Sequence, residues 1–141
     1  MLAVGGAPAV VIQGRLYARL LDTPGTARWI IRRQPHVGQN VHTVEAEPGE
    51  GGLVAPGDGE DQQLTVRPLL ALPGLPPRFP PNELWRLTPA DDRGPAFTLP
   101  SWSTGRYAGR QYWDRSLNPK MVAMLPREVS RDDARIDITA A

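Results

Sequence analysis

Apolar and polar residues alternate most clearly over residues 10–22. A period of two places one set of side chains on each face of an extended strand, which is typical of a strand with one buried face. The two faces differ as this period requires: Ile12, Leu16, Ala18 and Leu20 against Gln13, Arg15, Tyr17 and Arg19. The pattern predicts one strand over these residues.

A turn sequence separates this run from a second one. Pro24 presets the φ angle of a turn, and Gly25 can adopt a positive φ. In residues 26–34, Trp29 and Ile31 share one parity and arginines occupy the other. The two runs are therefore predicted to pair as an antiparallel hairpin.

Further strands are predicted along the first two thirds of the chain. Residues 41–46 (VHTVEA) form a third strand. Residues 64–72 alternate again, but Pro68 cannot donate to a ladder, so this strand should lie at a sheet edge or end there. Residues 84–88 and 96–99 flank turn residues as a second hairpin. The sum predicts an all-β fold, a small antiparallel barrel or sandwich of about five to seven short strands.

Two segments between these strands have unusual compositions. Residues 47–62 form an acidic loop rich in Gly and Pro. Residues 73–81 (PGLPPRFPP) are predicted to form a Pro-rich strap of extended or polyproline II backbone. We expect residues 1–100, which include both segments, to form the β domain.

Residues 101–141 are expected to form an extended C-terminal arm, because regular periodicity fades after Pro100. Within the arm, Asn118 and Pro119 resemble an N-cap and a first helical position, so one short helix is predicted through Leu125. Ser130 with Asp133 resembles a capping box for a terminal turn, and residues 135–139 could equally form a final strand.

The composition limits the fold and the chemistry. The 141 residues suit one domain, and 16 Pro with 14 Gly restrict helix length. The chain has no cysteine, which excludes disulfides and thiolate sites. The N-terminus lacks the basic region of a signal peptide, and no apolar run approaches the ~20 residues that span a bilayer. We expect a soluble protein without a signal peptide or a membrane partner.

The net charge of +1 is distributed unevenly. The side chains sum to +4 over residues 1–43, −6 over 44–61, +5 over 62–127 and −2 over 128–141. Patches of opposite sign on one small body favour contacts between copies of the chain. The alternative is that the acidic loop is simply solvated.

Candidate catalytic and metal-binding groups are few. No serine lies in a G-x-S-x-G sequence, and only His36 and His42 could act as a histidine base. Two histidines without cysteine are a thin ligand set for a metal, and Asp58–Asp61 does not match a calcium loop. Asp91 and Asp92 are adjacent, unlike a paired acid and base. The sequence therefore predicts no catalytic residue, metal or cofactor, and a protein that is not an enzyme.

The segment Ser101–Arg115 (SWSTGRYAGRQYWDR) interleaves aromatic rings with arginines. These residue types are enriched at the centres of protein interfaces, because they bury a large area and still form hydrogen bonds. The rings could also complete the core of the domain itself. The predicted partner-binding residues are Trp102, Arg106, Tyr107, Arg110, Tyr112, Trp113 and Arg115.

These features favour a structural or interaction protein over an enzyme. Small β proteins with extended arms suggest one part of a multi-copy assembly, such as a capsid decoration, connector or tail protein of a virion. Its partners would be other protein subunits, including copies of itself, in a virion or in the cytoplasm. The alternative is a β-barrel module that binds nucleic acid or carbohydrate, because rings stack on bases or sugars and guanidinium groups hold phosphate or hydroxyl groups.

Overall fold

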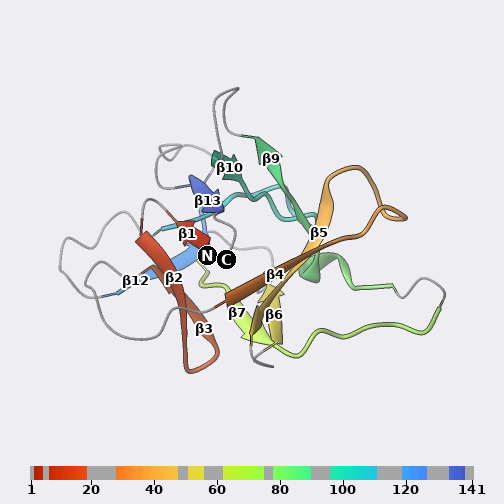
Figure 1. Cartoon of the computed structure of the whole chain (residues 1–141), viewed down its shortest axis with the longest axis horizontal. Helices are drawn as coiled ribbons and strands as arrows, with labels where there is room; N and C mark the ends of the chain where they lie inside the picture. The colour runs from red at the N-terminus through yellow and green to blue at the C-terminus, as the bar shows by residue number, and fades with distance from the viewer. Residues whose placement is uncertain are drawn as a thin grey trace.

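In the computed structural model of the chain, the regular secondary structure of the described residues is almost entirely antiparallel β-strand (Figure 1). It describes residues 2–4, 7–18, 28–47, 51–55, 62–74, 78–89, 96–110, 119–126 and 134–138. The strands are β1 (Leu2–Val4), β2 (Ala7–Ile12), β3 (Arg15–Ala18), β4 (Arg28–Arg33), β5 (Val41–Glu47), β6 (Gly51–Val54), β7 (Thr65–Arg67), β8 (Trp85–Arg86), β9 (Thr88–Pro89), β10 (Ala96–Thr98), β11 (Ala108–Arg110), β12 (Lys120–Met124) and β13 (Ile136–Ile138). The helical element in these residues is the short 3-10 turn η1 (Pro81–Glu83).

The strands pair into one curled sheet. Along its main path the order is β4-β5-β6-β7-β3-β2-β1-β13-β10-β9, while β8 pairs with β5 and β12 joins β11 to β3. The first and last strands are neighbours, since Leu2 to Val4 of β1 pair with Ile136 to Ile138 of β13. The all-β prediction is confirmed, and the sheet has the curled, β-trefoil-like form of a half-barrel. Five to seven strands were too few, because the described residues alone form a sheet of 13.

The concave side of the sheet encloses the hydrophobic core. Its large buried side chains include Leu16, Leu53, Leu64, Trp85 and Met124. Burial of one such side chain stabilises the fold by about 1.5–3 kcal/mol relative to exposure. The indole Nε1 of Trp85 donates to the Leu53 carbonyl at 3.2 Å, so the largest core side chain also satisfies its polar atom.

The predicted hairpin between residues 10–22 and 26–34 is wrong. A turn at Gln13 and Gly14, with φ of 52° and 73°, divides the first run into β2 and β3, which pair with each other. Positive φ at both central residues is the geometry of a two-residue hairpin turn. Across this turn Val11 pairs with Leu16 and Ile12 pairs with Arg15, so Ile12 shares the exposed face of Arg15, whereas the alternation placed it with the buried Leu16.

Three other predicted strand regions are confirmed. The third strand exists as β5, which pairs with β4 from Arg28↔Glu47 to Arg33↔His42. The second hairpin exists as β9 and β10, and the adjoining β8 pairs with β5. The strand that precedes Pro68 ends at Arg67 of β7, as the missing N–H of proline predicts.

The helix predicted over residues 118–125 is wrong: residue 118 lies outside the described residues, and Lys120–Met124 form the strand β12. Val122, Ala123 and Met124 are all buried, because β12 lies between β11 and β3. A strand that is buried on both faces has no alternation, so periodicity cannot separate it from a short buried helix.

The described residues after position 101 belong to the same sheet as the N-terminal strands. Lys120 and Met121 pair with β3, and Ile136 pairs with both β1 and β10. Residues 136–138 form a strand, which confirms one of the two alternatives for the final residues. No helix in the described part of the chain is long and apolar enough to cross a membrane.

Candidate protein-binding site

The Pro-rich segment folds back on itself instead of running straight as a strap. Leu72 and Arg78 exchange two backbone hydrogen bonds, Leu72 N–H to Arg78 O at 2.6 Å and Arg78 N–H to Leu72 O at 3.2 Å. In Figure 1 the chain leaves β7, extends away from the sheet to the right and returns to η1 beside β5. We name its described parts, residues 68–74 and 78–80, the proline loop.

The base of the proline loop lies directly on β6. A Cβ atom at Gly51 would lie 2.2 Å from the carbonyl carbon of Arg67, and one at Gly52 would lie 2.7 Å from the Leu69 side chain. Gly51 also has a φ of +104°, which side-chain-bearing residues rarely adopt. The two glycines therefore allow the loop to start in close contact with the sheet.

A buried carboxylate holds the loop a few residues further on. Glu83 of η1 is 3% exposed, and its Oε1 accepts a hydrogen bond from the Leu70 N–H at 2.7 Å. Its Oε2 has no hydrogen-bond partner within the described residues. A hydrogen bond to a charged acceptor is about twice as strong as a neutral one, so Glu83 fixes the backbone position of Leu70.

The outer part of the proline loop presents apolar side chains to solvent. Leu70 is 61% exposed and Leu72 is 47% exposed, and Ala71 between them is exposed as well. Large aliphatic side chains on a rigid, projecting loop suit contact with another protein.

A second candidate contact is the turn at residues 101–107, which we name the Trp102 turn. Ser101 N–H donates to the Arg106 carbonyl at 2.9 Å, and Gly105 N–H donates to the Ser101 carbonyl at 2.8 Å. Trp102 is 37% exposed, and the Arg86 guanidinium lies 5.0 Å from its ring centroid. This stacking orients the ring on the surface.

The two features share a groove of about 490 Å³. Its lining includes Trp102 on one side, Pro73, Arg78 and Phe79 of the proline loop on the other, and His36 from the loop between β4 and β5. Phe79 also lines a second groove, together with Glu45 and Leu69. Residues of the proline loop therefore line both grooves.

The predicted partner-binding residues divide into two groups. Tyr107 is 43% exposed, whereas Arg106 and Arg110 are half-buried and form contacts of their own. Tyr112, Trp113 and Arg115 lie outside the described residues. A partner-binding role for these seven residues, Trp102 included, stays a prediction.

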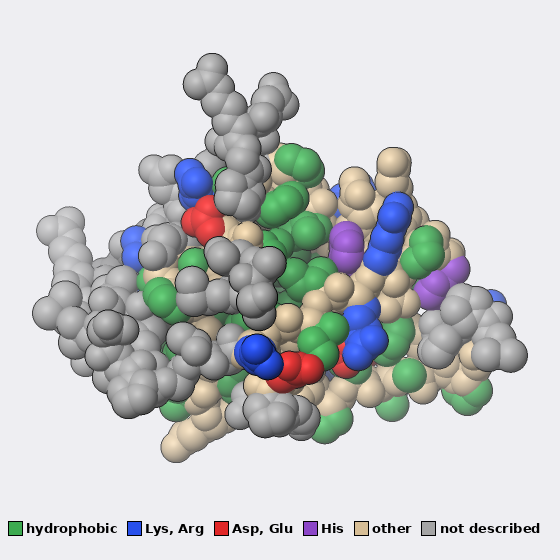
Figure 2. Space-filling view, viewed as in Figure 1, with side chains coloured by type: hydrophobic (Ala, Val, Ile, Leu, Met, Phe, Trp, Pro, Cys, Tyr) green, Lys and Arg blue, Asp and Glu red, His purple; other side chains and the backbone are tan. Residues whose placement is uncertain are grey.

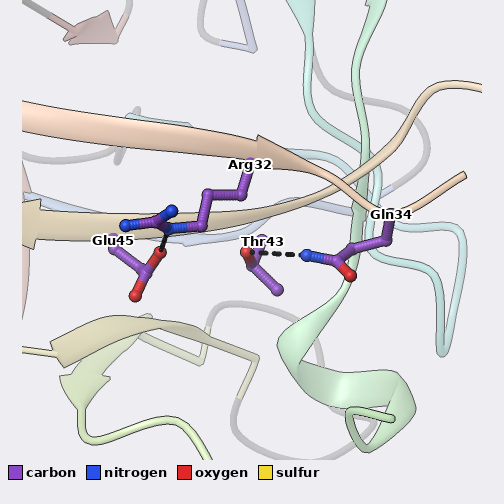
Figure 3. Close-up of polar contacts among 4 residues, drawn as sticks. All are labelled: Arg32, Gln34, Thr43 and Glu45. Carbon is purple, nitrogen blue, oxygen red and sulfur yellow. Dashed lines mark hydrogen bonds and ion pairs between the residues drawn. The ribbon is translucent and has the colours of Figure 1, made fainter. Parts of the chain in front are cut away.

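The charges on the described surface are partly paired within the chain. Arg32 Nε donates to Glu45 Oε2 at 2.6 Å across β4 and β5, and Gln34 Nε2 donates to the buried Thr43 Oγ1 at 3.4 Å (Figure 3). On the face drawn in Figure 2, the blue Lys and Arg side chains are separated by apolar, polar and acidic atoms. Glu45, from the predicted acidic patch, thus meets an arginine of its own chain.

The two histidines differ in their surroundings. His42 Nδ1 lies 2.9 Å from the Asn40 carbonyl, and His36 lines the groove beside Trp102. No group of three or more His, Cys, Asp or Glu side chains in the described ranges could hold a metal ion.

Sequence reasoning identifies the Trp102 turn as a candidate site but misses the proline loop. The alternation of Leu70 and Leu72 predicts a strand, and the prolines predict a strap. The clustering of prolines around Leu70 and Leu72 is the feature of the sequence that indicates a rigid loop. The anchor on Glu83, which lies 13 residues from Leu70 along the chain, has no signature in the sequence.

Two inhibitors of fungal origin are similar to part of this chain. A serine protease inhibitor of Lentinula edodes is 33% identical over 82 residues, which make up 58% of this chain and 56% of the relative. The solved structure of a proteinase inhibitor from Coprinopsis cinerea is 46% identical, with a TM-score of 0.53, and the match covers 56% of this chain and 55% of that chain. The chain therefore spans about half the length of the relatives that it matches.

The fold resembles that of a designed protein over nearly the whole chain. The designed 3-fold symmetric protein ThreeFoil matches with a TM-score of 0.73 over 99% of this chain and 96% of that chain. The sequences are 12% identical, so the likeness concerns the fold alone.

A family match decides between the function classes. Residues 1–89, more than half of the chain, match the peptidase inhibitor I66 family. The match overturns the prediction that the protein is a virion component, and with it the predicted location in a virion. It gives no support to the alternative of a module that binds nucleic acid or carbohydrate. The prediction of a protein that is not an enzyme is confirmed, since the family consists of inhibitors. The chain belongs to the peptidase inhibitor I66 family.

Proposed function

We propose that this protein inhibits a serine peptidase by occupying its active-site cleft. The match of residues 1–89 to an inhibitor family carries the proposal. The name of the relative from Lentinula edodes points to the serine class.

The proline loop supports inhibition by occupancy of a cleft. A segment that enters a cleft must already have its bound shape, because ordering one residue on binding costs about 1–2 kcal/mol of conformational entropy. The contacts of Gly51 and Gly52, the Glu83 hydrogen bond and the Leu72–Arg78 pairing order this loop in advance.

The Trp102 turn supports a second contact around the cleft. Its exposed indole borders the same groove as the proline loop, so one peptidase surface can cover both. Exposed aromatic and arginine side chains are the residue types that dominate binding energy in protein interfaces. We assign a role in this outer contact to Trp102, Arg106, Tyr107, Arg110, Tyr112, Trp113 and Arg115.

The partner in this proposal is a peptidase. The uneven charge distribution suggested that copies of the chain bind one another. In this proposal the bound surface belongs to a peptidase instead. The chain spans about half the length of its relatives, so inhibition by residues 1–141 alone is itself part of the proposal.

The test is a panel of inhibition assays with the full chain. Trypsin, chymotrypsin and subtilisin represent the serine class, with papain and pepsin as controls from other classes. We expect inhibition of at least one serine peptidase with a constant below about 1 μM, relieved competitively by substrate. If all three serine peptidases keep their full activity in an excess of this protein, the proposal is contradicted. Inhibition that substrate does not relieve contradicts occupancy of the cleft.

A further inference from the structure

The proline loop carries the most exposed aliphatic side chain among the described residues. Leu70 is 61% exposed and Leu72, two residues further on, is 47% exposed. The other large aliphatic side chain with comparable exposure, Ile12, is 38% exposed and lies on β2, next to the β2–β3 turn. Two exposed leucines on one anchored loop indicate a surface that becomes buried against a partner.

We propose that Leu70 enters the primary specificity pocket of the target, and that the target is a serine peptidase with a deep apolar pocket. This inference rests on the proposed function and adds to it the class of peptidase and the residue that selects it. The surface of the peptidase that the proline loop contacts is its active-site cleft.

The backbone around Leu70 offers the groups that a cleft needs. The Leu70 N–H donates a hydrogen bond to the Glu83 carboxylate, and the N–H and carbonyl of Leu72 both form hydrogen bonds with the backbone of Arg78. Between them, the Leu70 carbonyl and the N–H and carbonyl of Ala71 form no hydrogen bond with the described residues. Extended peptides bind to a protein edge through such free backbone groups, with side chains entering pockets.

The anchors on either side hold Leu70 in one position. The hydrogen bond from the Leu70 N–H to Glu83 fixes the N-terminal side of Leu70. The pairing of Leu72 with Arg78 fixes the chain that follows Leu70. Pro68 and Pro73 bracket the segment and restrict φ at both of its ends. The side chain can therefore enter a pocket without an ordering step in the loop.

The chemistry of leucine selects the pocket. A leucine gains from burial in an apolar slot, in proportion to the area that leaves water. In a pocket with a carboxylate at its base, as in trypsin, leucine leaves that charge without a partner. The expected preference is therefore for a chymotrypsin-like pocket over a trypsin-like one.

The experiment compares the full chain with three variants against chymotrypsin and trypsin. The unmodified chain should inhibit chymotrypsin at least about 10-fold more strongly than trypsin. Leu70→Asp should raise the chymotrypsin inhibition constant by about 100-fold or more, because it buries an unpaired charge. Leu70→Lys should reverse the preference in favour of trypsin, because lysine pairs with the pocket carboxylate.

The matched control is Ile12→Asp, which makes the same change of charge at an exposed aliphatic residue outside the loop. It should leave both constants unchanged, and thermal unfolding should show that all variants are folded. If Leu70→Asp inhibits as the unmodified chain does, or if the unmodified chain prefers trypsin, the inference is wrong and the proposed function stands. A chain that inhibits no serine peptidase overturns both.

Discussion

Glu83 illustrates how one buried side chain can organise an exposed loop. Its carboxylate is 3% exposed and faces the Leu70 N–H with one oxygen, while the other oxygen has no partner within the described residues. A buried charge that is only partly satisfied reduces stability. Its hydrogen bond to the Leu70 N–H offsets this cost and fixes the position of the loop.

Substitution of Glu83 tests this interpretation. Glu83→Gln retains an acceptor for the Leu70 N–H and removes the charge, so the free energy of unfolding should change by less than about 1 kcal/mol. Glu83→Ala removes the acceptor and should lower it by about 1–3 kcal/mol, with weaker inhibition. Urea unfolding followed by circular dichroism measures both. An alanine variant as stable and as inhibitory as the parent contradicts the anchoring role.

At the scale of elements, the fit between β6 and the start of the proline loop depends on two adjacent glycines. The positive φ of Gly51 and its approach to the Arg67 backbone leave no space for a side chain. At Gly52 the neighbouring atoms belong to the Leu69 side chain, which can move. The two positions therefore differ in what a methyl group would displace.

The paired alanine variants provide the comparison. Gly51→Ala combines backbone strain with a clash against backbone and should destabilise the protein by about 3 kcal/mol or more. Gly52→Ala should cost about 1 kcal/mol, because Leu69 can rotate away. Chemical denaturation of both proteins gives the two values, and a larger loss at Gly52 would contradict the described packing.

The same elements show what the sequence could predict. The strand predicted over residues 41–46 exists as β5, although both of its faces are partly buried, since the adjacent Thr43 and Val44 are both buried. β12 is buried on both faces and carries no alternation. The two-residue turn at Gln13 and Gly14 reverses the parity of the buried face, which places Ile12 and Leu16 on opposite faces within a run that the sequence shows as continuous. At the site, the ring and arginines of the Trp102 turn were visible in the sequence. The exposure of Leu70 was not, because it depends on contacts with β6 and Glu83 that are distant along the chain.

At the scale of the whole molecule, closure of the sheet depends on residues beyond the part that matches the family. β13 pairs with β1 and β10, and β12 pairs with β3. The buried side chains of these C-terminal strands include Val122, Met124 and Ile136.

Deletion of residues 101–141 should therefore prevent folding. The shortened chain loses β13 beside β1 and β12 beside β3, and it exposes core side chains. We expect no cooperative thermal transition by circular dichroism and poor dispersion of amide resonances. A cooperative transition in residues 1–100 would show that these residues form a domain by themselves, which also tests the predicted boundary after residue 100.

The anchors of the proline loop have a consequence for the peptide bond between Leu70 and Ala71. If a peptidase hydrolysed this bond, water would add a hydroxyl group to the Leu70 carbonyl carbon and a proton to the Ala71 nitrogen. Glu83 holds the chain on one side of the cut, and Arg78 holds it on the other, so the new carboxylate and amine would remain neighbours. Loss of water could then restore the bond, and cleavage would approach an equilibrium between cut and intact chains instead of destroying the protein.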